Sequence, residues 1–169
     1  PEKLVLSEVM QENSGLFRNK GILPIGMEFA TVDYSLLNLS TSGFLALIGD
    51  PDSRDRFVKN MLLMLAKTIV FHNVEAIIID DKQRKLKECS EYGFIRDYTA
   101  DVTEGMQLVS DFYDELNRRQ REMEDMSEYD SYLLLIIQNA EVFRKICSDK
   151  NESKALADAI KTAGEAGAF

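Results

Sequence analysis

The residues most able to do chemistry lie in a short polar stretch between an apolar run and an amphipathic one. This stretch reads GDPDSRDR over residues 49–56. A loop that cradles nucleotide phosphates has the pattern G-x-x-x-x-G-K-[ST] between a strand and a helix. Gly49 fits its first glycine, while Arg54, Asp55 and Arg56 stand at its second glycine, lysine and hydroxyl positions. The spacing predicts a degenerate nucleotide loop that keeps one of four defining residues.

Each of the three substitutions opposes binding of a magnesium triphosphate. Arg54 adds a side chain where glycine lets backbone N–H groups close around phosphate. Asp55 repels the phosphates that a lysine would neutralise, and two unit charges about 4 Å apart interact by roughly 4 kcal/mol at an effective dielectric near 20. Arg56 puts a cation where a hydroxyl would ligate magnesium. The reversal of charge at Asp55 by itself predicts an affinity loss of roughly a thousandfold.

An opposite interpretation stays open, because Arg54 and Arg56 would attract an anion to a helix N-terminus. Three aspartates and two arginines leave residues 50–56 with a net charge of −1. We therefore expect Arg54, Asp55 and Arg56 to pair with one another or with a partner. Ser53, one position earlier, belongs to the same candidate loop.

A second candidate motif follows the apolar run at 132–137. Phosphate-loop enzymes end such a strand with an acidic residue that serves the magnesium ion and the attacking water. Here the strand ends in the neutral amides Gln138 and Asn139, and Glu141 is expected in the first turn of a helix. We predict no catalytic residue, no metal ligand and no bound cofactor, with weak magnesium-ATP binding as the alternative.

Asp80 and Asp81 end another apolar run. They would contact a nucleotide in one interpretation, but a strand-ending turn before Lys82 is favoured.

Apolar runs alternate with helical patterns along the chain. Short runs without alternation are typical of strands buried on both faces of a parallel sheet. Spacings of three and four predict helices that cover such a sheet. The class expected is α/β, a mostly parallel sheet flanked by helices. The predicted strands are 44–48, 76–79, 94–98 and 132–137, and the predicted helices are 54–70, 103–125 and 152–164.

Residues 1–43 differ from the rest. Short strands are predicted at 4–9, 22–25 and 34–39, as an antiparallel lead-in that packs on one edge of the sheet. The lead-in belongs to the same domain as the core, which spans 44–169. A covered parallel sheet of three or four strands would leave an open edge. We therefore expect the core to continue beyond residue 169.

Composition narrows the possible functions. The net charge of −9 argues against a nucleic-acid surface, and two basic clusters, at 82–87 and 118–121, are expected to be solvated faces. The single histidine, His72, and the distant Cys89 and Cys147 do not make a zinc site. The thiols fit a reducing, cytosolic setting. No apolar run is long enough to cross a bilayer, so no direct membrane contact is expected.

Taken in order, several segments resemble the FtsK/SpoIIIE group of motor ATPases. The chain looks most like the C-terminal ATPase domains of the EssC family, the membrane-anchored coupling proteins of type VII secretion in Gram-positive bacteria. The similarity covers nearly the whole chain. It rests on ILPIGMEF (22–29), YSLLNL (34–39), GFLALIGDPDS (43–53), IIIDDK (77–82), YTADVTEG (98–105) and LLLIIQNAEVF (133–143).

This resemblance implies a RecA-like P-loop domain in a series of such domains on the cytoplasmic side of the membrane. It implies neighbouring ATPase domains of the same protein, secreted protein substrates and a ring assembly as partners. With the motif losses, it favours a non-hydrolysing domain that regulates its neighbours. A weak ATP-binding motor domain and a substrate-binding docking module are the alternatives.

Overall fold

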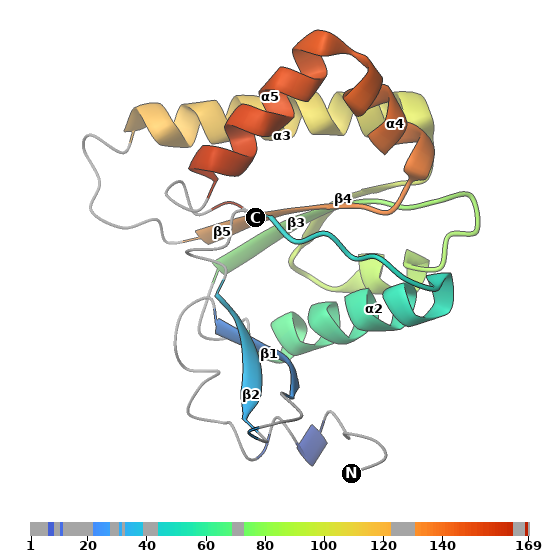
Figure 1. Ribbon diagram of the computed structural model, residues 1–169, viewed down its shortest axis with the longest axis vertical. Helices are drawn as coiled ribbons and strands as arrows, with labels where there is room; N and C mark the ends of the chain where they lie inside the picture. Colours follow the sequence, from blue (N-terminus) through green and yellow to red (C-terminus); the bar gives the residue numbers. More distant parts are fainter. Residues whose placement is uncertain are drawn as a thin grey trace.

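The computed structural model describes residues 7–8, 11, 22–27, 31, 33–38, 44–68, 73–122, 131–163 and 168. Strands and helices alternate along these ranges (Figure 1). The elements are β1 (Ile22–Met27), β2 (Tyr34–Asn38), α2 (Pro51–Thr68), β3 (Asn73–Ile79), the 3-10 helix η3 (Lys87–Glu91), β4 (Ile95–Thr99), α3 (Val102–Glu122), β5 (Ser131–Ile137), α4 (Ala140–Ser148) and α5 (Lys150–Thr162).

The central sheet has the order β4-β3-β5, and both pairings are parallel. Helices cover both faces: α2 lies on one face, and α3, α4 and α5 lie on the other (Figure 1). Side chains of β3 alternate between the two layers, with Ala76 and Ile78 in the α2 core and Ile77 and Ile79 in the α3 core. A strand buried on both faces needs apolar residues at every position, which explains the unbroken run. The α/β class is confirmed.

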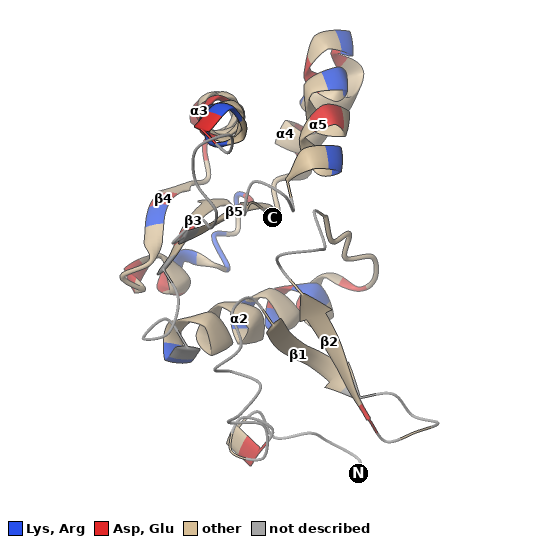
Figure 2. Ribbon diagram, turned by 90° about the vertical axis from the view of Figure 1, so that its left-hand side faces the viewer, with Lys and Arg blue, Asp and Glu red and all other residues tan. Residues whose placement is uncertain are grey.

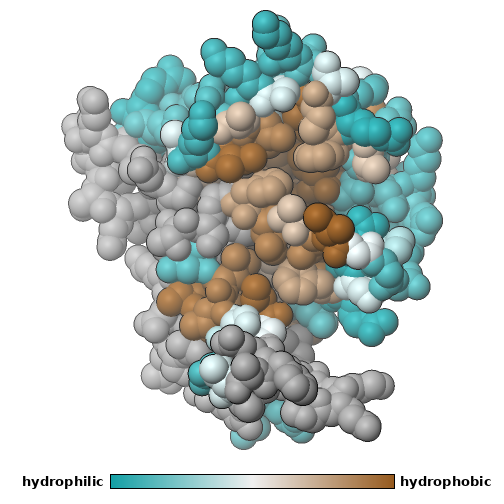
Figure 3. Space-filling view, in the orientation of Figure 1, coloured by the Kyte–Doolittle hydropathy of each residue, from teal (hydrophilic) through white to brown (hydrophobic). Residues whose placement is uncertain are grey.

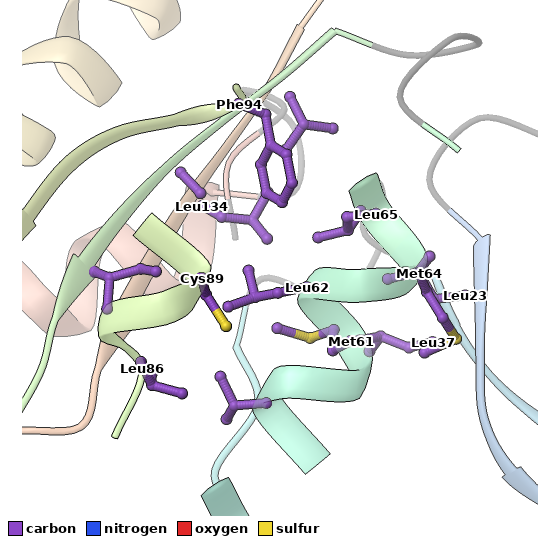
Figure 4. Close-up of a cluster of buried hydrophobic side chains, with 14 residues drawn as sticks. Leu23, Leu37, Met61, Leu62, Met64, Leu65, Leu86, Cys89, Phe94 and Leu134 are labelled. Carbon is purple, nitrogen blue, oxygen red and sulfur yellow. The ribbon is translucent and has the colours of Figure 1, made fainter. Parts of the chain in front are cut away.

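The core on the α2 side joins the sheet to the N-terminal hairpin. Leu62 and Leu65 project from α2 toward the side of Leu134 of β5, whereas Met64 lies beside Leu23 of the hairpin (Figure 4). Leu62 is fully buried. This helix was predicted from the spacing of its apolar residues, and the prediction is confirmed.

The predicted hairpin is present, but its position differs from the prediction. Strands β1 and β2 pair antiparallel as a separate two-stranded sheet. Their buried Leu23 and Leu37 pack against α2 and not against an edge of the central sheet. Each strand has an apolar face, and packing of these faces against α2 removes Met64 from water. The strand predicted at 4–9 is wrong where the chain is described, because Ser7 and Glu8 are helical.

The strand predicted over 44–48 is also wrong. This segment has no regular secondary structure and forms no ladder with any strand in the described ranges. Leu45 and Leu47 pack against the α2 core, whereas Phe44 is 50% exposed and Ile48 is 96% exposed. A strand requires a hydrogen-bonded neighbour, and residues 44–48 have none in the described ranges. One edge of β5 pairs with β3, and at the other edge Leu133 is bridged by Ala168 and not by residues 44–48.

The basic clusters are mostly solvated, as predicted, but one residue of each departs from the prediction. Arg119 is buried, and its Nε donates to Glu115 Oε1 at 2.9 Å. Arg118 donates to the same carboxylate, and these bonds outweigh partial burial to lower the pKa of Glu115 to about 2. In the first cluster Lys85 is committed to an ion-pair network, described below.

Gly105 lets α3 approach the sheet closely, and we expect Gly105→Ala to lower the melting temperature. An added Cβ would lie 2.9 Å from Ile79 Cγ2 and 3.1 Å from Val142 Cγ2, both on fully buried residues. Overpacking of this kind costs about 1–3 kcal/mol, which exceeds the gain of up to ~1 kcal/mol from helix propensity. Thermal unfolding followed by circular dichroism measures the change. The control is Gly93→Ala, whose Cβ meets no heavy atom within 4 Å; equal melting temperatures for the two variants would refute the close packing.

Candidate nucleotide site

The candidate site lies where the segment before α2 meets the carboxyl ends of β3 and β5. Parallel strands gather their carboxyl ends at one edge of a sheet, which is where α/β proteins bind ligands. Gln138 and Asn139 follow β5, Asp80 follows β3, and Gly49 and Asp50 precede α2. Residues of both charges gather at the N-terminal end of α2 (Figure 2). The sequence-predicted residues are therefore brought to one edge of the fold.

The predicted phosphate loop is replaced by helix. Helix α2 begins at Pro51, three residues before the expected start, and the N–H of Arg54 already donates to the carbonyl of Asp50. Proline suits the first helical position because its missing N–H and fixed φ cost nothing there. Gly49 has a φ of 152°, a backbone conformation that residues with a side chain rarely adopt. The glycine at this motif position therefore also serves the turn into the helix.

Asp50 caps this helix and occupies the donors that a phosphate would use. Its Oδ1 accepts from the N–H of Asp52 at 3.0 Å, and its Oδ2 accepts from the N–H of Ser53 at 3.1 Å. A hydrogen bond with the Ser53 side chain, followed by these backbone bonds, lowers the pKa of Asp50. The Asp50 carboxylate thus occupies the position at the N-terminus of α2 where a free anion would bind.

Asp55, at the lysine position of the motif, is held by two groups from other elements. Its carboxylate accepts a hydrogen bond from Gln138 Nε2, and its Oδ2 lies 2.8 Å from Lys85 Nζ. Lys85 also contacts Asp52 Oδ1 at 2.9 Å. These bonds, with Asp55 first, raise the pKa of Lys85 well above its usual value. Asp55 is only 7% exposed, so the network is partly shielded from water. We call these four residues, Asp52, Asp55, Lys85 and Gln138, the acid–lysine lock.

The two arginines of the loop behave differently from the expectation. Arg54 and Arg56 are exposed, and neither forms an ion pair with any residue in the described part of the chain. The predicted pairing of Arg54, Asp55 and Arg56 with one another is therefore wrong, because α2 projects successive side chains about 100° apart and of the three turns only Asp55 toward the sheet. Pairing of the two arginines with a partner stays a prediction.

Asn139 is a structural residue. Its Oδ1 caps α4 by accepting from the N–H groups of Glu141 and Val142, and its Nδ2 donates to the carbonyl of Asp80 at 3.1 Å. The predicted place of Glu141 in the first turn of a helix is confirmed. A ligand would have to break these buried bonds to use Asn139. Gln138 differs, because only its amide nitrogen is bonded, while its buried Oε1 has no hydrogen-bond partner.

Asp80 organises the loop that delivers Lys85. It is fully buried, and its carboxylate accepts from the N–H of Asp81, the N–H of Leu86 and the hydroxyl of Tyr98. Arg84 has a φ of 54°, which turns the chain back just before Lys85. The favoured interpretation of Asp80 as a strand-ending turn residue is confirmed.

Sequence reasoning missed Asp50 and Lys85 as members of the site. An aspartate followed by proline at the start of a helix is an N-cap signal, and it was available in the sequence. Lys85 lies 30 residues from Asp55, and its role depends on the turn at Arg84, which no local pattern predicted. His72 lies outside the described residues, Cys89 is buried and Cys147 is exposed.

Two further properties follow from the described ranges. No His, Cys, Asp and Glu side chains cluster there as metal ligands would. None of the helices in those ranges combines the length and the apolar character that a membrane span needs.

The fold is similar to that of solved type VII secretion ATPases. The chain matches the cytoplasmic domain of EssC with a TM-score of 0.71 at 16% identity, covering 100% of this chain and 34% of that one. EssC (ATPases 2 and 3) from Geobacillus thermodenitrificans gives 0.68 at 18% identity, covering 100% and 31%. EccC (ATPases 2 and 3) from Thermomonospora curvata, solved with a signal sequence peptide, gives 0.65 at 18% identity, covering 88% and 28%.

No protein-family model matches the sequence, and no curated protein matches it either. The chain spans about a third or less of the length of the solved chains named above. At these identities the likeness concerns the fold, which is that of the EssC and EccC ATPase domains.

Proposed function

We propose that this chain is an ATPase-fold domain of a type VII secretion coupling protein that does not hydrolyse ATP and regulates neighbouring ATPase domains. One observation carries the proposal: at the lysine position of the phosphate loop, Asp55 is bound by Lys85 and Gln138. The residues that would meet a triphosphate and its magnesium ion are bonded to each other instead.

Phosphate binding is opposed by the helix cap. A triphosphate would have to displace the Asp50 carboxylate from the N–H groups of Asp52 and Ser53, and it would leave that carboxylate nearby. Displacement of a tethered anion by a free one gains no new hydrogen bond and adds like-charge repulsion. Empty donors at a helix N-terminus favour anions, but here they are taken.

Magnesium-dependent chemistry is opposed at the other side of the site. Gln138 and Asn139 are neutral, and the Asn139 side chain is already committed to α4 and to the Asp80 carbonyl. Neither amide is a base at neutral pH, so neither would activate a water molecule. Independent ATP turnover is therefore not part of the proposal.

The proposed setting follows from the resemblance and from the fold. The solved chains are described as cytoplasmic domains or as ATPases 2 and 3, which supports a place beside other ATPase domains of one membrane-anchored protein. Secreted proteins as substrates and a ring assembly belong to the same proposal, while the net charge of −9 speaks against nucleic acid. The burial of Leu23 and Leu37 against α2 supports one domain in which 1–43 leads into the core at 44–169.

A thermal-shift titration with magnesium-ATP tests the proposal. We expect the melting temperature to change by less than about 1 °C at millimolar nucleotide. A ligand at 100 times its dissociation constant stabilises a fold by about 2.7 kcal/mol, which is a shift of roughly 5–10 °C for a domain of this size. A saturable shift of that size would favour the weak ATP-binding alternative.

A rebuilt loop provides the positive control. In the variant Arg54→Gly, Asp55→Lys, Arg56→Thr we expect a larger shift with magnesium-ATP than in the unmodified chain, because two lysines then face the phosphates. The shift stays below that of a saturated site because Asp50 still caps the helix. Hydrolysis should stay negligible because Gln138 is unchanged. Efficient turnover by this variant would contradict the role given to Gln138.

A further inference from the structure

The carboxyl edge of the central sheet is positively charged, although the chain is acidic. Residues 50–56 contain three aspartates and two arginines, and residues 80–87 contain two aspartates, one arginine and three lysines. Their net charges of −1 and +2 leave the two segments together at +1, whereas the whole chain carries −9. The contacts of Lys85 with Asp52 and Asp55 hold the two segments side by side. This edge therefore differs in charge from the rest of the molecule.

Every acid of these two segments is already bonded to a group of this chain. Three carboxylates accept hydrogen bonds from backbone N–H groups, namely those of Asp50, Asp80 and Asp81. The other two carboxylates contact Lys85, and they belong to Asp52 and Asp55. The negative charges at this edge are therefore compensated within the fold.

Most of the cations at this edge are not compensated in the same way. Lys85 belongs to the acid–lysine lock, and Lys87 Nζ lies 4.6 Å from the centre of the Tyr98 ring. The other four are exposed and form no ion pair with any residue in the described ranges. We call these four the basic rim: Arg54, Arg56, Lys82 and Arg84. Hydrophilic side chains line the margin of the molecule at the N-terminal end of α2, apart from the apolar side chains in the middle of the same face (Figure 3).

The basic rim lies on both sides of the acid–lysine lock. Arg54 and Arg56 flank Asp55 along α2, and residues two apart on a helix project about 160° from each other. Lys82 and Arg84 stand just before Lys85, in the turn that brings this lysine to α2. One small anion would not reach both sides of the lock. A ligand with several separate anionic groups would.

We propose that the basic rim binds an acidic polypeptide segment of a neighbouring protein domain, with carboxylates on both sides of the lock. Arginine binds carboxylates through two parallel hydrogen bonds. A phosphate ligand is disfavoured because Asp50 already takes the backbone N–H groups at the start of α2. A long nucleic acid would extend from the rim onto the acidic remainder of the chain, whereas a short acidic segment would not. The inference rests on the proposed function, because a domain without ATP turnover regulates its neighbours through contacts.

Binding of a labelled peptide tests this surface. The probe is a short fluorescent peptide in which glutamates alternate with glycines, and its anisotropy is measured at low ionic strength. We expect Arg54→Glu with Arg56→Glu to weaken binding by about tenfold or more, because repulsion replaces attraction at two positions. The matched control is Lys150→Glu with Lys154→Glu on α5, which changes the net charge equally at two exposed lysines without ion pairs in the described chain. We expect less than about a twofold effect from this control. Equal weakening by both pairs, or no binding of the peptide by the unmodified chain, would overturn the proposal.

Two further measurements separate charge from fold and carboxylate from phosphate. Arg54→Lys with Arg56→Lys should weaken peptide binding by only about threefold, because it keeps the charge and loses the paired hydrogen bonds. A loss as large as that of the glutamate pair would contradict the electrostatic basis of the proposal. A single-stranded oligothymidine of the same charge is expected to bind more weakly than the peptide, and tighter binding would overturn the choice of a polypeptide.

The peptide titrations contain no nucleotide, so their outcome is independent of the thermal-shift test with magnesium-ATP. A thermal shift with ATP would count against the proposed function even if the peptide bound as expected. Absence of peptide binding would refute the acidic partner and leave the absence of ATP turnover standing.

Discussion

Asp55→Lys is expected to lower the free energy of unfolding by about 2–4 kcal/mol. The variant removes a buried carboxylate from Lys85 and places a second ammonium beside it. Breaking a buried ion pair by changing one partner costs about 3–5 kcal/mol, and the partial exposure of Lys85 reduces this figure. Urea unfolding at neutral pH measures the loss.

The charge-reversed double variant Asp55→Lys, Lys85→Asp is the matched test. We expect it to recover about half of the loss, because the pair is restored with the same total side-chain length. The Gln138 amide can rotate to present its oxygen to Lys at position 55. Recovery stays incomplete because the new aspartate lies near Asp52. A double variant no more stable than Asp55→Lys alone would mean that the ion pair contributes nothing.

The acid–lysine lock also sets a pH dependence at the alkaline end. Hydrogen bonds to Asp55 and Asp52 raise the pKa of Lys85 in the folded state. A raised pKa means that this contribution is fully present below the unfolded value of about 10.4 and is lost as pH rises through the folded value. The lock is therefore intact throughout the physiological range.

Regular elements were predictable wherever the apolar pattern alone decides the structure. The runs at 76–79 and 132–137 became β3 and β5 because strands buried on both faces cannot tolerate polar residues. The helix predicted over 103–125 matches α3 for the same reason, since its stripe faces the sheet. In these three segments the apolar pattern predicted the buried positions correctly, whereas in 44–48 it did not, because Phe44 and Ile48 are exposed.

Two failures of prediction share one cause, which is that pairing is not encoded in a single segment. Residues 44–48 have a strand composition, but the described chain supplies no hydrogen-bonded neighbour to them. The hairpin is present as predicted, but it packs against α2 and not against the edge of the central sheet. In both cases the neighbouring segment, and not the local sequence, determines the structure.

The site was predicted in position but not in bonding. Spacing placed Gly49, Asp55 and Gln138 together, and the structure brings all three to the same edge. Spacing did not reveal that the lysine for this site comes from residue 85. In this chain α2 supplies the acid, Asp55, and the turn after β3 supplies the base, Lys85. Motif matching could not predict this contact, because the motif covers one contiguous loop and Lys85 lies outside it.

Asp80→Ala is expected to lower the free energy of unfolding by about 3–5 kcal/mol. Asp80 is fully buried and accepts hydrogen bonds from two backbone N–H groups and from the Tyr98 hydroxyl. Alanine would leave these donors unpaired in the interior, and each such group costs about 1–3 kcal/mol. Asp81→Ala is the matched control, since Asp81 is half-buried and its carboxylate accepts only from the N–H of Gln83 among the hydrogen bonds of the described chain.

The same variant links the turn after β3 to the acid–lysine lock. With the N–H of Leu86 released, the neighbouring Lys85 loses its fixed position opposite Asp55. In the Asp80→Ala background, Lys85→Ala should therefore cost less than it does in the unmodified chain. A double-mutant cycle by urea unfolding measures this difference, for which we expect a coupling of about 0.5–2 kcal/mol. Strictly additive losses would show that the turn does not position Lys85.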